Sequence, residues 1–276
     1  MGGLVFLLKS SISKIDKEAK KERESNSTFF VYKAWIILLV SSFCLWALHY
    51  LKFKSTLYAF ILSLEGFFDI SEHLWYFTIK NHLYAELFSY VWWASWHYIF
   101  FLFVPMLVIR FVFKEKLSAY AWQKGKVGEH FRLYVGIILF LIVFLSFVSY
   151  HSAFSSFYPF YHQAHRSWFD FLAWEFLYLA QFVALEFFFR GFLLQGLRVP
   201  LGSIAMPVMM MPYMMIHFPK LSLEAGGALF FGLILALLAF RSRSIWGGVA
   251  IHFAVALTLD ISALLQNHPL PKVFFP

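Results

Sequence analysis

The sequence predicts an all-α fold, a polytopic transmembrane helical bundle with about seven to eight spans and a C-terminal core of four helices. Composition is the first observation behind this prediction, because 61% of the 276 residues are hydrophobic and only 14% are charged, whereas soluble domains carry about 25% charged residues. The second observation is that several apolar runs approach the roughly 20 residues needed to cross a bilayer. These runs are continuous rather than alternating, which disfavours a membrane β-barrel.

Composition also divides the chain into three parts. Residues 1–33 form a basic cytoplasmic segment, residues 34–168 hold the N-terminal transmembrane helices and loops, and residues 169–276 hold the polar core. A short apolar stretch, Thr56–Phe68, carries Glu65 and is expected to lie at the membrane interface or to re-enter the membrane. The expected spans are Ala34–Leu51, Leu87–Phe113, Leu133–Tyr150, Phe169–Leu194, Ile204–Phe218, Ala225–Phe240 and Ile245–Leu265.

The lysines and arginines predict the orientation of these spans. If the N-terminus lies inside, only six of the 23 basic residues fall outside, namely Lys52, Lys54, Lys80, Arg166, Lys220 and Lys272. This bias predicts an integral protein of the inner or plasma membrane with a cytoplasmic N-terminus and an external C-terminus. The net charge of +8 is thus attributed to membrane topology, and no nucleic-acid partner is expected.

Three ionisable side chains, Glu175, Glu186 and Arg190, line one stripe of the otherwise almost wholly apolar stretch Phe169–Leu197. Glu186 and Arg190 are four residues apart, so in a helix they share a face and can pair. Glu175 precedes Glu186 by 11 residues, a rotation within about 20° of the same face. Charged groups are costly in hydrocarbon, so this stripe is expected to face the bundle interior or a wet cavity and is a functional-site hypothesis.

The later apolar segments add four polar side chains to this set. Tyr213 and His217 are also four residues apart, on a segment that two prolines are expected to kink. His252 lies on the last segment, and Asp260 follows it at about 80° round the same helix. All the intramembrane polar groups of interest thus fall within the C-terminal core.

Glu186, His217 and His252 are suited to the activation of water. A carboxylate or imidazole in a low-dielectric site can act as a general base, and a second imidazole can donate to an oxyanion. The same trio is a possible His₂Glu zinc set, and spacing leaves the metal-free and metal-bound alternatives open. A structural interpretation stands beside both, because a Glu–Arg pair can serve packing alone. The pair His162 and His165 is expected to lie in a solvated outer loop.

Three short motifs follow one another in this core: Leu185-Glu186-Phe-Phe-Phe-Arg190, Tyr213-Met-Met-Ile-His217 and His252-Phe-Ala-Val-Ala256. In order and spacing they resemble the Glu-Glu-x-x-x-Arg, aromatic-x-x-x-His and His-x-x-x-Asn/Asp motifs of one family. This is the type II CAAX prenyl protease and bacteriocin-immunity (Abi, CPBP) family of intramembrane proteases. The resemblance covers about Phe169–Ile261, a third of the chain.

The resemblance implies an intramembrane endopeptidase that hydrolyses a peptide bond of a membrane-anchored peptide or protein substrate by Glu/His-activated water. It implies no required cofactor, and zinc remains the alternative from the residues alone. The residues assigned to catalysis are Glu186, Arg190, His217, His252 and Asp260, and those assigned to substrate binding or support are Glu175 and Tyr213.

Two motif positions depart from the family pattern. Leu185 stands where the family has the first Glu, its water-activating base, and Ala256 stands where it has Asn or Asp. We expect Glu186 to take the role of the base. We expect Asp260, one turn further along the helix, to replace the missing oxyanion-binding group.

Two other classes of function fit parts of the same pattern. A family member that no longer cleaves would act as a membrane immunity or scaffold protein, which the two departures would suit. An ion-coupled transporter could use the intramembrane charges as a relay, but transporters usually show internal repeats, and this chain shows none.

Overall fold

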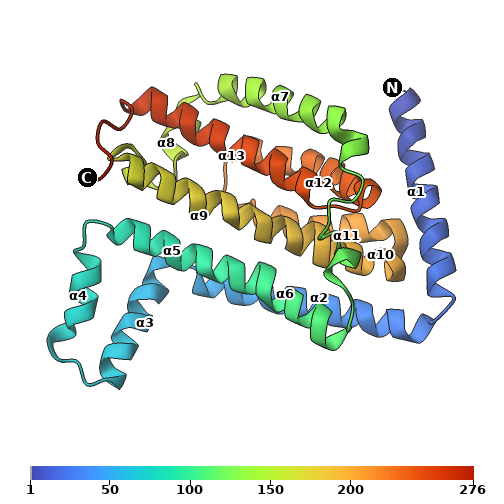
Figure 1. The fold of residues 1–276 in the computed structure, drawn as a ribbon, viewed down its shortest axis with the longest axis horizontal. Coiled ribbons are helices and arrows are strands. Elements are labelled where there is room, and N and C mark those ends of the chain that lie inside the picture. Colours follow the sequence, from blue (N-terminus) through green and yellow to red (C-terminus); the bar gives the residue numbers. More distant parts are fainter. Residues whose placement is uncertain (1) are drawn as a thin grey trace. The chain divides into compact units, whose positions relative to one another are not determined.

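A computed structural model describes residues 2–276, apart from the side chains of residues 2–8, 152, 155 and 156 (Figure 1). Within this range every regular element is helical and no strand occurs, which confirms the predicted all-α class. The α-helices are α1 (Gly2–Arg23), α2 (Ser27–Leu51), α3 (Lys54–Phe67), α4 (Leu74–Lys80), α5 (Ala85–Tyr98), α6 (Val104–Leu107), α7 (Phe131–Val148), α8 (Ser152–Phe157), α9 (Trp168–Glu186), α10 (Gly196–Leu201), α11 (Ala205–Met215), α12 (Ser222–Ser242) and α13 (Trp246–Asn267).

Shorter segments of tighter or wider helix connect or extend these elements. Three are π-helical, namely η2 (Ile99–Phe103), η3 (Val108–Val112) and η7 (Phe187–Gln195). The 3-10 turns are η1 (Ser71–His73), η4 (Leu117–Tyr120), η5 (Gly128–His130), η6 (His162–His165) and η8 (Gly202–Ile204).

Six helical stretches of the described chain are long and apolar enough to cross a membrane, against the expected seven to eight. They are Ser27–Leu51, Ala85–Val112, Gly128–Val148, Trp168–Met215, Ser222–Ser242 and Trp246–Asn267. Large apolar side chains are exposed along them, as on α7, where Phe147 is 74% exposed. Such exposure suits contact with lipid, which solvates apolar side chains without cost.

The difference in span count arises at Gly202. The expected helices Phe169–Leu194 and Ile204–Phe218 fall within the single stretch Trp168–Met215. Gly202 has φ +60° and ψ −135°, a conformation that only glycine adopts readily, and α11 packs back against η7 beyond this turn. At about 1.5 Å per residue α11 is about 16 Å long, too short to cross a bilayer by itself.

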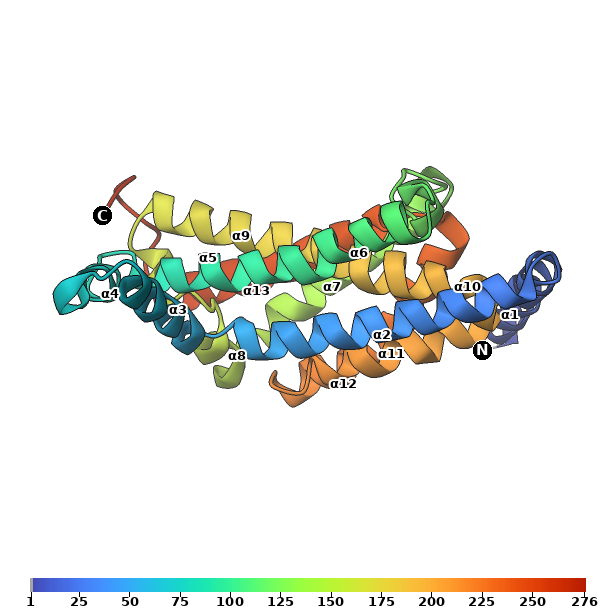
Figure 2. The same ribbon diagram turned by 90° about the horizontal axis from the view of Figure 1, so that it is seen from below.

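Contacts group the chain into two compact units, each made of three stretches. The first unit comprises residues 1–43, 104–131 and 186–249. Its centre is η7, all nine residues of which are buried, and α11 lies beside α12 in both views (Figures 1 and 2). A hydrophobic π-helical segment therefore forms the core of this unit, and α10 and α11 pack on it.

The second unit comprises residues 44–103, 132–185 and 250–276. Within it α3 packs on α4 and α5. The stretch expected at the interface is α3, which has 14 residues and is too short to span. Its Glu65 is 1% exposed and accepts hydrogen bonds from the backbone N–H groups of Trp75 (2.6 Å) and Tyr76 (3.0 Å). The carboxylate thus satisfies free donors in the first turn of α4, where the helix dipole favours negative charge.

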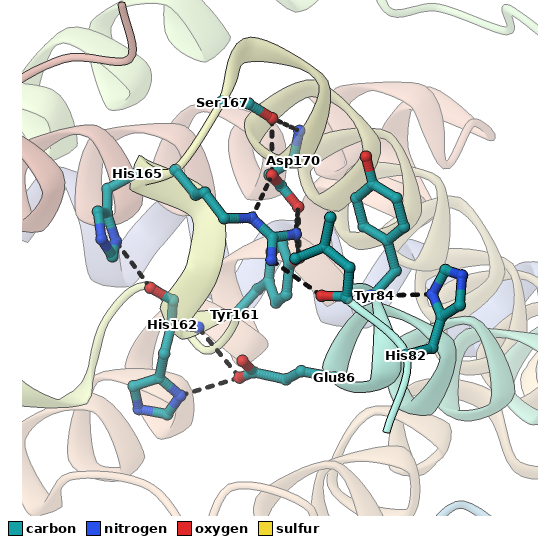
Figure 3. A network of polar contacts seen from close by, with 10 residues as sticks. His82, Tyr84, Glu86, Tyr161, His162, His165, Ser167 and Asp170 are labelled. Carbon is teal, nitrogen blue, oxygen red and sulfur yellow. Dashed lines mark hydrogen bonds and ion pairs between the residues drawn. The ribbon is translucent and has the colours of Figure 1, made fainter. Parts of the chain in front are cut away.

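A polar network in the second unit fixes the start of α9 (Figure 3). Asp170 accepts from Tyr161 Oη (2.5 Å), Ser167 Oγ (2.6 Å) and the Arg166 guanidinium (2.6 and 2.9 Å). The hydrogen bond to Asp170 raises the pKa of Arg166. Burial, with the hydrogen bond to Asp170, raises the pKa of Tyr161. The network therefore keeps Arg166 charged and Tyr161 protonated as donors at the membrane boundary.

The two histidines of the expected outer loop lie beside this network (Figure 3). The side chain of His162 is 75% exposed, as expected of a solvated loop, but its Nδ1 and backbone N–H both contact Glu86 Oε1, at 3.0 and 3.1 Å. His165 donates from Nδ1 to the carbonyl of His162 (2.9 Å) and stacks on His268 at 3.9 Å between ring centroids. These contacts attach the loop to α5 and to the C-terminal segment.

Candidate active site

Glu186 and Arg190 form the buried ion pair that their spacing predicts. Arg190 Nη1 lies 3.2 Å from Glu186 Oε1, and both residues are 0% exposed. Glu186 is the last residue of α9, and Arg190 belongs to η7, so the pair lies where the α-helix changes to a π-helix. Single π-turns within α-helices occur often at functional sites, and this one could not be read from the 3.6-residue periodicity of the sequence.

Tyr213 and His217 lie next to this pair in the first unit. The Arg190 guanidinium stands over the Tyr213 ring, 4.1 Å from its centroid, a cation–π contact that favours the buried charge. The Tyr213 carbonyl is 2.8 Å from His217 Nδ1. A carbonyl can only accept, so Nδ1 carries the proton, and in the neutral ring Nε2 is the acceptor nitrogen. The structure therefore brings four of the predicted residues together.

Gly248 allows α13 to approach the Glu186 carboxylate closely. A Cβ at this position would lie 2.7 Å from Glu186 Cδ and closer still to Oε2, well inside van der Waals contact. Only glycine fits there without displacing the carboxylate. His252 is four residues further along α13, so it projects from the same face of that helix one turn beyond Gly248.

A loop that precedes α7 supports η7 from another side. The Tyr120 carbonyl lies 2.8 Å from where a Cβ on Gly191 would be, and the Trp122 ring meets Phe187 edge-on at 5.2 Å. Tyr120 Oη donates to Glu115 (2.6 Å), which also pairs with Lys33 at 2.7 Å. Burial, with the bond to Glu115, raises the pKa of Tyr120. A loop backbone therefore makes a close approach to η7 at Gly191.

His252 belongs to the second unit and has an aromatic neighbour there. Its ring stacks on Phe182 of α9, with centroids 5.0 Å apart and planes 18° apart. His252 is half-buried, whereas Ala256, one turn further on, is 1% exposed. The motif position that the family fills with Asn or Asp is therefore a packed apolar position in this chain.

Asp260 and Glu175 form a second polar group in the same unit. Asp260 is 0% exposed and accepts a hydrogen bond from Trp174 Nε1 at 2.7 Å. Glu175, 5% exposed, lies close enough to Asp260 for the two carboxyl groups to interact. The sequence pointed to both acidic residues but not to Trp174, whose indole N–H helps to satisfy the buried Asp260.

The hydrogen bond from Trp174 to Asp260 gives a stability prediction. Trp174→Phe removes the donor and leaves the buried carboxyl less satisfied, so we expect the free energy of unfolding to fall by about 1–3 kcal/mol. Thermal unfolding in detergent, followed by circular dichroism, measures this loss. Trp168→Phe is the matched control because its side chain is 37% exposed. Equal midpoints for the two variants would show that this hydrogen bond does not stabilise the unit.

Within the described part of the chain, no three His, Cys, Asp or Glu side chains are arranged to hold a metal ion. Neither motif order nor helical spacing identified Gly248, Tyr120, Trp122 or Trp174 as parts of these sites. Each of them contacts a site residue that is distant in the sequence. The glycine in the Trp246-Gly-Gly248 run was the one available sequence signal, because small residues before a motif histidine permit close helix approach.

The comparisons with known proteins bear on this region. Residues 166–258 match the family described as Rce1-like, type II CAAX prenyl endopeptidase Rce1-like. No curated protein and no solved structure matches the chain. The matched residues include all three motifs and, except for Asp260, every residue that the sequence assigned to catalysis, substrate binding or support. Together with six helices able to span a membrane, this match supports an integral membrane protein in which residues 166–258 are similar to the type II CAAX prenyl endopeptidase family.

Proposed function

We propose that the protein is an intramembrane endopeptidase that hydrolyses a peptide bond of a membrane-anchored peptide or protein. The observation that carries the proposal is the fully buried Glu186–Arg190 pair, next to Tyr213 and His217, inside the segment that matches the endopeptidase family. A charge pair buried among phenylalanines is costly to maintain for packing alone. Such groups in a membrane segment commonly mark a functional site.

In the proposed reaction Glu186 takes a proton from water, and the resulting hydroxide attacks the scissile carbonyl carbon. His252 donates a hydrogen bond to the oxyanion that forms on the carbonyl oxygen. His217, whose Nε2 is the acceptor nitrogen, accepts a hydrogen bond from the attacking water and orients it. The proton that Glu186 took from water then passes to the leaving amine as the C–N bond breaks. Arg190 holds the Glu186 carboxylate through the ion pair, and Tyr213 orients His217 through its carbonyl. Asp260 is proposed to support oxyanion binding in place of the residue lost at Ala256.

The distribution of basic residues supports an N-terminus inside and a C-terminus outside. On this orientation the substrate is a chain segment that lies in or next to the bilayer. Nothing in the site residues requires a prenyl group. Leu185 and Ala256 favour one second candidate, a family member that binds such a segment without cleaving it.

Two histidine variants test the proposed function. We expect His217→Ala and His252→Ala each to lower turnover of a membrane-tethered peptide library by about 10²–10⁴-fold, because each removes a group that acts on the transition state. The assay uses purified full-length protein in detergent, with cleavage products identified by mass spectrometry. His49→Ala, an exposed position on α2, is the control and should keep wild-type turnover.

Stable binding of a library peptide without any cleavage by the wild type would favour the scaffold function and contradict the protease. The same assay separates metal-free from zinc chemistry. We expect a strong zinc chelator to leave turnover unchanged, whereas loss of turnover that added zinc restores would assign the trio to a metal.

A further inference from the structure

A cavity of about 500 Å³ lies in the first unit, away from the ion pair of the candidate active site. Residues of α1 from Ser10 to Glu18 form one wall, and Phe240, Arg241 and Arg243 at the end of α12 form another. Arg198 of α10 and the segment from Lys126 to His130 complete the lining. The volume falls within the range typical of small-molecule sites.

The lining of this cavity carries an excess of positive charge. Its basic side chains are Lys14, Lys126, Arg198, Arg241 and Arg243, and its carboxylates are Glu18 and Glu129. Five cations against two anions leave a surplus of positive charge at neutral pH. A cavity with this balance attracts an anion and would repel a cationic ligand.

Acidic neighbours neutralise part of this charge and leave a surplus of two cations. Lys126 pairs with Glu129 at 3.0 Å, Arg198 pairs with Glu22 at 2.8 Å, and Arg243 Nη2 lies 3.4 Å from Glu18. In the part of the chain that the structure describes, neither Lys14 nor Arg241 forms an ion pair. Burial and the nearby charge of Arg198 together lower the pKa of Arg243. The carboxylates of Glu18 and Glu22 offset part of this effect. A bound anion would add negative charge beside the two guanidinium groups and beside the surplus cations Lys14 and Arg241.

The position of the cavity identifies the source of the anion. It lies at the end of the apolar span Ser222–Ser242, where a membrane helix meets the interface. Phe240, which is 4% exposed, adds an apolar wall beside the arginines. Guanidinium groups bind phosphate oxygens through paired hydrogen bonds, and basic pockets at the ends of membrane helices suit phospholipid headgroups. We propose that this cavity binds the phosphate group of an anionic phospholipid.

Binding of short-chain lipids to the full-length protein in neutral detergent tests the proposal. Native mass spectrometry measures the apparent Kd for dioctanoyl phosphatidylglycerol, dioctanoyl phosphatidylcholine and inorganic phosphate. The test variant is Lys14→Gln with Arg241→Gln. It removes two cations without leaving a carboxylate that has lost its ion pair. The matched control is Lys20→Gln with Lys124→Gln, which changes the charge equally but leaves the cavity lining intact.

We expect the wild type and the control to bind phosphatidylglycerol more tightly than phosphatidylcholine. We expect the test variant to bind it roughly thirtyfold more weakly, since each of the two basic residues near a lipid surface contributes about 1 kcal/mol. The site would be assigned to free phosphate if the test variant weakened the binding of inorganic phosphate but left the binding of phosphatidylglycerol unchanged. That result would overturn the lipid source. Equal weakening in the test and control variants, or no binding by the wild type, would overturn the site itself.

Discussion

Glu186→Gln is expected to abolish peptide cleavage, with a loss of at least about 10²–10⁴-fold in turnover, because it removes the proposed general base. The variant also leaves the Arg190 guanidinium, 0% exposed, without its carboxylate. An unpaired buried charge costs about 3–5 kcal/mol, so the midpoint of thermal unfolding should fall as well. Turnover and thermal unfolding are measured on the same detergent-purified sample.

A double variant separates the loss of chemistry from the loss of stability. In Glu186→Gln with Arg190→Met, no unpaired charge remains, and buried ion pairs replaced by apolar groups often cost little stability. We expect the unfolding midpoint to return towards the wild type while cleavage stays absent. Cleavage that persists in Glu186→Gln would remove Glu186 from the role of base. Cleavage that returns in the double variant would assign the pair to packing.

Gly248→Ala is expected to lower both stability and turnover. The new Cβ would lie 2.7 Å from Glu186 Cδ, so the carboxylate or α13 must shift. Overpacking of this kind costs about 1–3 kcal/mol, and a displaced base loses its alignment with water. Thermal unfolding and the cleavage assay measure the two effects.

Gly227→Ala is the matched control for this variant. Gly227 also lies within a helix, α12, but a Cβ there would meet no atom within 4 Å. Alanine is the better helix former by roughly 0.5–1 kcal/mol, so the control should be neutral or slightly more stable. Equal unfolding midpoints and equal turnover in the two variants would show that the close approach of α13 to Glu186 matters for neither stability nor cleavage.

Local spacing predicted the contacts that a single helix or turn makes. Glu186 with Arg190, and Tyr213 with His217, are four residues apart and meet as expected, because helical geometry places such residues on one face whatever surrounds them. The same holds for the membrane-spanning helices, whose apolar runs need no partner to be recognised. Contacts between segments follow no such rule. Trp174 reaches Asp260 across 86 residues, and no periodicity in the sequence pairs them.

The number of membrane-spanning helices could not be predicted from local sequence alone. The sequence placed a seventh span at Ile204–Phe218, but the structure forms the 11-residue α11 there, after a turn at Gly202. Apolar composition alone could not separate a crossing helix from a short one, because the turn depends on Asp16 of α1, which accepts from the Ser203 backbone N–H at 2.7 Å. That bond joins segments far apart in the chain.

The sequence by itself determined that this protein is a helical membrane protein whose glutamate and histidine motifs resemble those of one protease family. Those properties depend on residue type and on spacing within a helix. Only the tertiary structure decided that Glu186 lies at the junction of α9 and the π-helical η7, that Gly248 packs on its carboxylate, and that a basic cavity forms beside Arg243. A π-turn, a glycine contact and a cavity are products of packing between distant segments, and packing is fixed only when the whole chain has folded.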